Sequence, residues 1–258
     1  QSGAIRPLNN MLPRNLFNAE HEAFRETVRK FYAKEVVPNI EKYEQQQHVD
    51  RELWNKAGAM GLLCATMPEA YGGSGVDRLY SMILIEEQAY AMDSSTGFSL
   101  HSDIVANYIN NFGSEAQKHY WLTRMASGET VTAIAMTEPG TGSDLQAVRT
   151  TAVLDGDDYI INGSKIFITN GYLCDMAIVV CKTGDSEKGS ANLSLVIVEA
   201  DRAGFSKGKP LNKIGMKGQD TCELFFDHVR VPKENLLGME GMGFMMLMKE
   251  LAWERMLV

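Results

Sequence analysis

The chain has 258 residues, of which 45% are hydrophobic and 22% charged, and its formal net charge is −8. This length corresponds to about 1.7 average domains, and the composition is globular, which excludes a disordered chain, a collagen and a low-complexity tract. The net negative charge argues against a general nucleic-acid-binding protein, which would carry a basic face.

The first half of the chain is predicted to be helical. Asn18 is a suitable N-cap for a helix whose apolar residues recur at helical spacing, and Pro38 interrupts this helix or begins the next. Ser114 and Gln117 have the spacing of a capping box, which predicts a helix from there to Ser127. Further helices are expected over residues 50–61, 79–92 and 94–112.

Strand-like runs replace helices from about Thr130. The dipeptide Asn162-Gly163 separates two of these runs and predicts a hairpin with a type I′ turn. Helices followed by strands, without alternation, argue against a doubly wound α/β sheet. The predicted strands are 131–136, 150–154, 159–161, 165–168, 177–181, 193–198 and 222–226.

The helical pattern returns in residues 244–258. The segment contains no glycine, cap or polar tail at its end, so we expect the chain to stop within an element. The predicted organisation is a helical domain, a β domain and the start of a second helical domain.

The richest loop follows the first strand and covers residues 136–144, Met-Thr-Glu-Pro-Gly-Thr-Gly-Ser-Asp. Its two glycines could let the backbone turn its N–H groups toward one point, a nest that suits a diphosphate, and Thr137, Thr141 and Ser143 add hydroxyl donors. The third glycine of a dinucleotide-binding fingerprint is absent. Taken alone, the loop is more typical of an ordinary connection between strands.

A second candidate is the run Phe167-Ile168-Thr169-Asn170-Gly171 at the end of a strand. A planar cofactor could pack on Phe167 while Thr169 forms a hydrogen bond with a ring edge. In isolation, a strand end with an ordinary turn explains the same residues.

The third candidate is the pair Glu254-Arg255 in the last helix. A helical wheel places Arg255 within the stripe of Phe244, Leu247 and Leu251 and Glu254 at its edge, on a helix that is apolar nearly all round and therefore predicted to be buried. A buried carboxylate is costly unless it is paired. The pair is either an ion pair inside a bundle or a general base whose pKa is raised by its apolar setting.

The remaining chemistry-bearing residues predict no metal site. Cys64, Cys174, Cys181 and Cys222 form no Cys-x-x-Cys pair, no His cluster accompanies them, and we interpret them as reduced core residues. No run approaches the ~18 apolar residues of a membrane helix, and the first 14 residues show no apolar signal segment.

Together these motifs resemble the acyl-CoA dehydrogenase family, along essentially the whole chain. The segments that carry the resemblance are 68–75, 135–144, 163–171 and 215–221. The resemblance implies an α+β multidomain fold: an N-terminal helical domain over residues 1–129, a β-barrel-like middle domain over 130–238, and the first helix, 239–258, of a truncated C-terminal helical bundle.

The resemblance also implies FAD and a catalytic glutamate. Glu254-Arg255 is similar to the pair that supplies the base in the long-chain and isovaleryl branches of the family, which makes Glu254 the catalytic residue. The implied cofactor contacts are Ile134, Ala135, Met136, Thr137, Gly142, Ser143, Phe167, Ile168 and Thr169. The implied substrate contacts are Ser143, Ser190, Ala191, Trp253, Glu254 and Arg255.

The implied reaction is the dehydrogenation of a medium- or long-chain fatty acyl-CoA to a trans-2-enoyl-CoA, as in β-oxidation. Glu254 would remove a proton from Cα while a hydride leaves Cβ for flavin N5, and the electrons would pass to an electron-transfer flavoprotein. An acyl-CoA oxidase of the same fold and a flavin-free acyl-CoA-binding protein are the alternatives. We expect a homotetramer or dimer for the full-length protein, no nucleic acid and no membrane insertion. The compartment would be the mitochondrial matrix in a eukaryote and the cytoplasm in a bacterium, and the 258-residue chain by itself is expected to turn over poorly.

Overall fold

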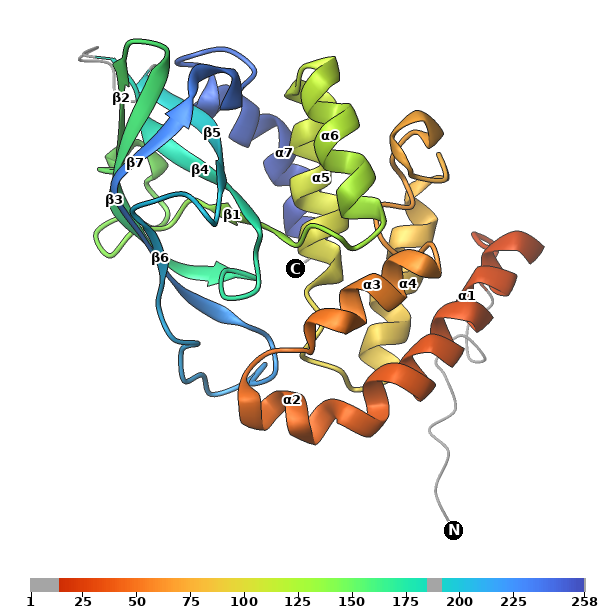
Figure 1. Cartoon of the computed structure of the whole chain (residues 1–258). Helices are drawn as coiled ribbons and strands as arrows, with labels where there is room; N and C mark the ends of the chain where they lie inside the picture. Colours follow the sequence, from red (N-terminus) through yellow and green to blue (C-terminus); the bar gives the residue numbers. More distant parts are fainter. Residues whose placement is uncertain (1–13, 185–191, 258) are drawn as a thin grey trace.

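The computed structural model describes residues 14–184 and 192–257 and shows helices followed by a sheet and a final helix (Figure 1). The α-helices are α1 (Ala19–Phe31), α2 (Ile40–Gln46), α3 (Arg51–Ala59), α4 (Arg78–Tyr90), α5 (Ala106–Phe112), α6 (Glu115–Ala126) and α7 (Gly243–Leu257). The π-helical turns are η2 (Tyr32–Val36) and η5 (Leu100–Val105), and the 3₁₀ turns are η3 (Val37–Asn39), η4 (Glu69–Tyr71), η6 (Leu145–Ala147) and η8 (Lys233–Asn235).

Local capping explains where several helices begin. The Asn18 side chain accepts from the His21 amide at the start of α1, and Ser114 and Gln117 form the predicted capping box of α6. Pro38 lies in the 3₁₀ turn η3, between α1 with its π-helical extension and α2.

The helix predicted over residues 94–112 begins later than expected, at Phe98. The Asp93 carboxylate accepts hydrogen bonds from the amides of Ser95 and Thr96, at 2.9 and 3.1 Å. These bonds satisfy the backbone in a turn, so the helix cannot extend back through this segment.

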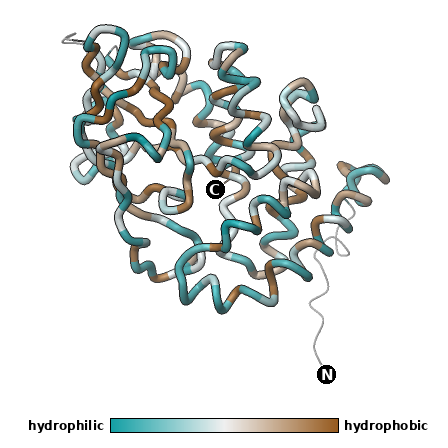
Figure 2. Tube along the Cα trace, in the orientation of Figure 1, coloured by the Kyte–Doolittle hydropathy of each residue, from teal (hydrophilic) through white to brown (hydrophobic). Residues whose placement is uncertain are grey.

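The middle of the chain forms one mixed sheet with the strand order β6-β7-β3-β2-β4-β5-β8, to which β1 is added by parallel pairing with β4. Strands β4 and β5 are almost fully buried, and Figure 2 shows hydrophobic positions concentrated in the sheet. The strands are β1 (Thr132–Ala135), β2 (Thr151–Asp155), β3 (Asp158–Thr169), β4 (Met176–Lys182), β5 (Leu193–Glu199), β6 (Phe205–Lys207), β7 (Thr221–Pro232) and β8 (Leu236–Leu237).

The predicted hairpin at Asn162-Gly163 is wrong, because β3 runs continuously through both residues. The chain turns earlier, at Gly156, so that β2 and β3 form the hairpin. Gly163 lies at an irregularity in the pairing with β7, with φ of 152°, and a Cβ there would stand 2.4 Å from Thr150 Oγ1. The glycine is needed because Thr150, the residue just before β2, approaches its backbone closely, and not because the chain turns there.

The helical domain and the sheet share one hydrophobic core. Tyr108 and Leu122 from the helices, Ile178 and Leu195 from the sheet, and Leu247 from α7 all belong to the same buried cluster. Helix α7 therefore packs at the junction, between the sheet and α5 (Figure 1).

Candidate active site

The two segments singled out as cofactor contacts lie side by side. The Ile166 amide of β3 donates to the Thr137 carbonyl at 2.9 Å, which joins the loop after β1 to the end of β3. Ile134 and Ala135 are buried in β1, whereas Met136 and Thr137 are half-buried where the strand ends. The fold thus places residues about 30 positions apart in the sequence at one edge of the sheet.

Phe167 protrudes from this edge on a β-bulge. The pairing of β3 with β7 shifts register between Lys165 and Ile168, and Phe167 has φ of +60° with 63% of its surface exposed. An aromatic residue in the left-handed region is strained, and such strain is typical of functional sites. Ile168 is buried behind it, so the bulge turns the Phe167 ring away from the core.

A buried ion pair between Lys165 and Glu138 stabilises the loop that follows β1. The Lys165 side chain has no exposed surface, and its Nζ donates to the Met136 carbonyl at 3.1 Å and to Glu138 Oε1 at 2.9 Å. Glu138 also accepts from the amides of Arg149 and Thr150. Burial raises the pKa of Glu138, but the hydrogen bonds from Thr150 and Lys165 outweigh it and lower the pKa overall, so the carboxylate stays ionised.

The nest expected from the two loop glycines does not form. Neither Gly140 nor Gly142 takes a positive φ, and the amides of Glu138 and Thr141 each donate to the other residue's carbonyl. The N–H groups of Glu138 and Thr141 are therefore used within a tight turn, and the backbone lacks the left-handed residue that a nest requires. Gly142 and Ser143 are exposed beyond this turn, and Ser143 is accessible to a ligand.

Glu254 lies on the buried side of α7, where it contacts the helical domain. The Tyr108 hydroxyl donates to Glu254 Oε1 at 2.6 Å, and one turn earlier Asn111 Nδ2 donates to Glu250 Oε1 at 2.8 Å. Burial raises the pKa of Glu254 and the charge of Glu250 adds to this, while the Tyr108 hydrogen bond and Arg255 act in the opposite direction. A carboxylate whose pKa is raised by an apolar setting is a stronger base than one in water.

The predicted orientation of α7 needs correction. Its buried positions are Gly243, Met246, Leu247, Glu250 and Glu254, so the buried stripe includes Glu254 and excludes Arg255, which is exposed. The helix is not buried all round in this chain, because Met245, Met248 and Met256 are exposed. A helical wheel gives the angles between residues but not the side that faces the rest of the protein.

The half-buried Trp253 is fixed by the helical domain. Its Nε1 donates to the Asp103 carbonyl at 3.1 Å, and the Arg78 guanidinium lies 4.1 Å from the centre of its ring. These contacts, with the Tyr108 bond to Glu254, hold α7 against η5 and α5 at the level of the carboxylate.

A cavity of about 400 Å³ joins the sheet edge to α7. Thr169, Gln219 and Thr221 form a polar wall on the sheet side. On the opposite side, the helices contribute the apolar residues Ile85, Ala89, Leu100, Ile104 and Leu257 together with the polar residues Gln88, Asp93, Thr96 and Ser99. Leu257 lies one helical turn beyond Glu254 and Ile104 one turn before Tyr108, so both residues of the hydrogen-bonded pair are helical neighbours of residues that line the cavity, although neither of the pair lines it.

The structure therefore brings together Met136, Thr137, Phe167 and Thr169, and it connects Thr169 with α7 through the cavity. Ser190 and Ala191 lie outside the described residues. Sequence reasoning did not find Tyr108, which is 146 positions from Glu254 and forms part of no motif.

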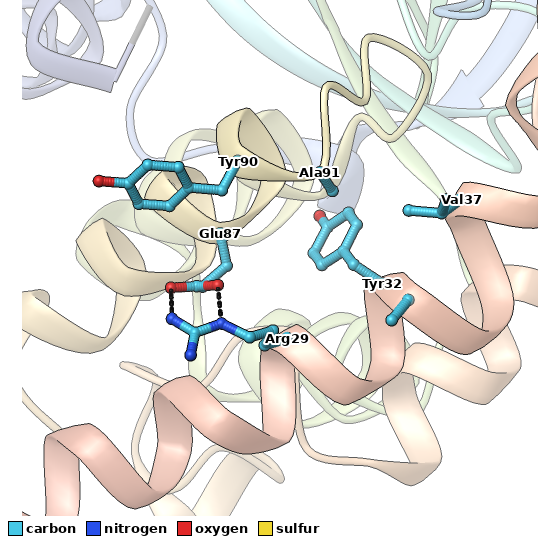
Figure 3. Close-up of a pocket in the computed structure, with 7 residues that line it drawn as sticks. Arg29, Tyr32, Val37, Glu87, Tyr90 and Ala91 are labelled. Atoms are coloured by element: carbon cyan, nitrogen blue, oxygen red, sulfur yellow. Dashed lines mark hydrogen bonds and ion pairs between the residues drawn. The ribbon is translucent and has the colours of Figure 1, made fainter. Parts of the chain in front are cut away.

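A second cavity, of about 280 Å³, lies between α1 and α4 and shares no lining residue with the first. Figure 3 shows Glu87 in this cavity, where its two carboxylate oxygens accept from the Arg29 guanidinium, both at 2.9 Å. Arg25 binds the same carboxylate from the buried side. Because Arg29 and Arg25 both bind Glu87, we interpret the charged residue that lines this cavity as part of an ion-pair network that joins α1 and α4.

The structure agrees with the interpretation of the four cysteines as core residues. All four cysteines are free and buried. Within residues 14–184 and 192–257, no group of three or more His, Cys, Asp or Glu side chains could hold a metal ion. None of the helices in these ranges is long and apolar enough to span a membrane.

The same arrangement occurs in known proteins. Residues 18–129 match the acyl-CoA dehydrogenase N-terminal domain and residues 133–229 match the acyl-CoA dehydrogenase middle domain. The chain belongs to the acyl-CoA dehydrogenase family. The long-chain specific acyl-CoA dehydrogenase of Sus scrofa mitochondria is 50% identical over 259 residues, covering 100% of this chain and 60% of the relative, so the chain spans about 60% of that relative's length.

Two solved structures extend the comparison. The acyl-CoA dehydrogenase of Geobacillus kaustophilus superposes with a TM-score of 0.92 at 46% identity and covers 94% of this chain and 64% of its own. An acyl-CoA dehydrogenase complexed with FAD, from Bacillus anthracis, superposes with a TM-score of 0.84 at 37% identity and covers 93% of this chain and 41% of its own. Both confirm a helical domain followed by a sheet domain and the start of further helices, and the sheet is mixed.

Proposed function

We propose that this chain carries the base and part of the flavin site of an FAD-dependent acyl-CoA dehydrogenase, which converts a fatty acyl-CoA to its trans-2-enoyl-CoA. The observation that supports this most directly is the position of Glu254. Its buried carboxylate lies one helical turn before Leu257, which lines the cavity between α7 and the sheet, and Thr169, two residues after Phe167, lines the same cavity from the sheet side.

The residues present fit an isoalloxazine ring. Phe167 offers an exposed aromatic face on a strained bulge, and Thr169 offers a hydroxyl that lines the cavity two residues later. The exposed loop of Gly142 and Ser143 follows the adjacent strand and can reach the polar parts of a cofactor or of CoA. FAD, when bound, would accept the hydride that leaves the acyl chain, and this hydride carries both electrons of the oxidation.

Glu254 acts in this proposal as the general base. It must be ionised to accept a proton from Cα of the thioester, and a raised pKa strengthens it as a base while leaving it ionised above that pKa. The apolar side chains of the cavity would reduce the exposure of the aliphatic chain to water. Arg255 is exposed in this chain and is proposed only as a peripheral substrate contact, with Trp253 in a supporting position.

The apolar side chains of the cavity also support the choice of substrate. Ile85, Ala89, Leu100, Ile104 and Leu257 suit an aliphatic chain, and the relative from Sus scrofa is named as long-chain specific, so we propose a medium- or long-chain acyl group. We further propose an electron-transfer flavoprotein as the acceptor. Peroxide release in air without such an acceptor would instead indicate an oxidase.

The test is Glu254→Gln in the complete protein, purified with FAD. We expect the variant to keep its flavin but to lose bleaching of the flavin absorbance when palmitoyl-CoA is added anaerobically, by about 10²–10⁴-fold in rate or more. Glu240→Gln is the control, because Glu240 is an exposed glutamate just before α7. Normal bleaching by Glu254→Gln would exclude this residue as the base.

A further inference from the structure

Tyr108 and Glu254 form an isolated buried pair at the junction of α5 and α7. The Tyr108 side chain has no exposed surface, and its hydroxyl stands 2.6 Å from Glu254 Oε1. This distance is in the range of a charge-assisted O–H···O⁻ hydrogen bond. No other side chain among the described residues donates to Glu254, and Oε2 accepts no hydrogen bond from them.

The surrounding charges do not replace this bond. On α7 itself, Glu250 is bound to Asn111, Lys249 lies over the Phe112 ring, and Arg255 is exposed. No salt bridge to Glu254 occurs in the described part of the chain.

The elements packed against α7 add no cation at hydrogen-bond distance. From η5, the Asp103 carboxylate accepts from Ser81, and from α4, Arg78 is stacked on Trp253. Strand β5 ends at Glu199, and this carboxylate is paired with Arg202. The state of the Glu254 carboxylate therefore depends on burial, on the Tyr108 hydroxyl and on the charges of its α7 neighbours Glu250 and Arg255.

We propose that Tyr108 is a positioning residue for the base. It holds Glu254 Oε1, keeps the carboxylate in the form that accepts a proton and leaves Oε2 to receive that proton. This inference rests on the proposed function, because it takes Glu254 as the base.

The phenol is suited to the role because it stays protonated. Burial and the adjacent Glu254 raise the pKa of Tyr108, so it remains a donor at all working pH values. A hydrogen bond to the ionised form of a carboxyl lowers its pKa. Tyr108 thus opposes the upward effect of burial, and its removal should leave Glu254 protonated over a wider pH range.

The decisive variant is Tyr108→Phe in the complete FAD-loaded protein, with the rate of flavin reduction by palmitoyl-CoA measured from acidic to alkaline pH. The rate falls as pH drops through the pKa of the base, and loss of the hydrogen bond raises that pKa. We expect the acid limb of the profile to move up by about one pH unit, which is about a tenfold lower rate below the limb. The rate above the limb should return to within a few-fold of the wild-type value.

Tyr159→Phe is the matched control, because the Tyr159 hydroxyl also donates to a glutamate, Glu240, at 2.8 Å, but in the sheet domain. Tyr159→Phe should not shift the pH profile of the rate of flavin reduction. If Tyr108→Phe folds poorly, difluorotyrosine introduced at position 108 keeps the shape and donates more strongly, so the acid limb should move to lower pH.

A measurement without turnover tests the same point. The infrared band of the protonated Glu254 carboxyl, identified by its loss in Glu254→Gln, should titrate at higher pH in Tyr108→Phe. An unmoved profile in both Tyr108 variants, or a loss that is uniform with pH, overturns the role of Tyr108. Normal flavin reduction by Glu254→Gln would instead overturn the proposed function, so the two failures can be distinguished.

Discussion

Replacement of Lys165 by methionine should destabilise the protein strongly. Lys165 Nζ lies within hydrogen-bond distance of the Met136 carbonyl and of Glu138 Oε1, with no exposed side-chain surface. Methionine has a similar volume but no charge, so the substitution leaves Glu138 ionised, buried and without its cation.

The magnitude follows from this geometry. Breaking a buried ion pair by removing one partner costs about 3–5 kcal/mol. Glu138 retains hydrogen bonds from the Arg149 amide and from the amide and hydroxyl of Thr150, which offset part of the loss. We expect a decrease of about 3 kcal/mol in the free energy of unfolding, partly recovered in Lys165→Met/Glu138→Gln, because the second change removes the uncompensated charge.

Urea denaturation of the complete protein measures the effect. The control is Lys233→Met, which removes an exposed ion pair with Asp157 and should leave the free energy of unfolding nearly unchanged, because solvent screens this pair. A loss below about 1 kcal/mol for Lys165→Met, or no recovery in the double variant, would refute the reasoning.

Two further predictions concern pH and backbone packing. Burial lowers the pKa of His101 to about 4, so its neutral form stabilises the fold fully above about pH 6.5, and this contribution of about 3 kcal/mol is lost as pH falls toward 4. The urea midpoint should therefore fall less on acidification in His101→Gln than in wild type, and an equal fall would contradict the assignment. Gly163→Ala places a Cβ 2.4 Å from Thr150 Oγ1 and should destabilise by roughly 2–4 kcal/mol, whereas Gly156→Ala, which meets nothing within 4 Å, should cost about 1 kcal/mol. Equal unfolding midpoints for the two glycine variants would show that the close approach does not matter.

Patterns local in the sequence predicted most of the elements. The cap at Asn18, the capping box at Ser114 and the apolar strands β4 and β5 depend on neighbours within a few residues, and the structure confirms them. The same local reasoning failed at Asn162-Gly163, where pairing with β7 keeps the strand extended despite a dipeptide typical of turns. It also failed on the conformation of the loop glycines Gly140 and Gly142.

The sequence by itself determined the order of helices, strands and helix, and it predicted the loop of Ser143, the Phe167 segment and Glu254 as candidate site residues. Only the tertiary structure decided which side of α7 is buried, and so that Glu254 faces inward and Arg255 outward. It also decided that Tyr108 binds the carboxylate. The physical reason is that caps and periodicity act over one or two helical turns, whereas the environment of a buried charge is set by side chains that only packing brings together.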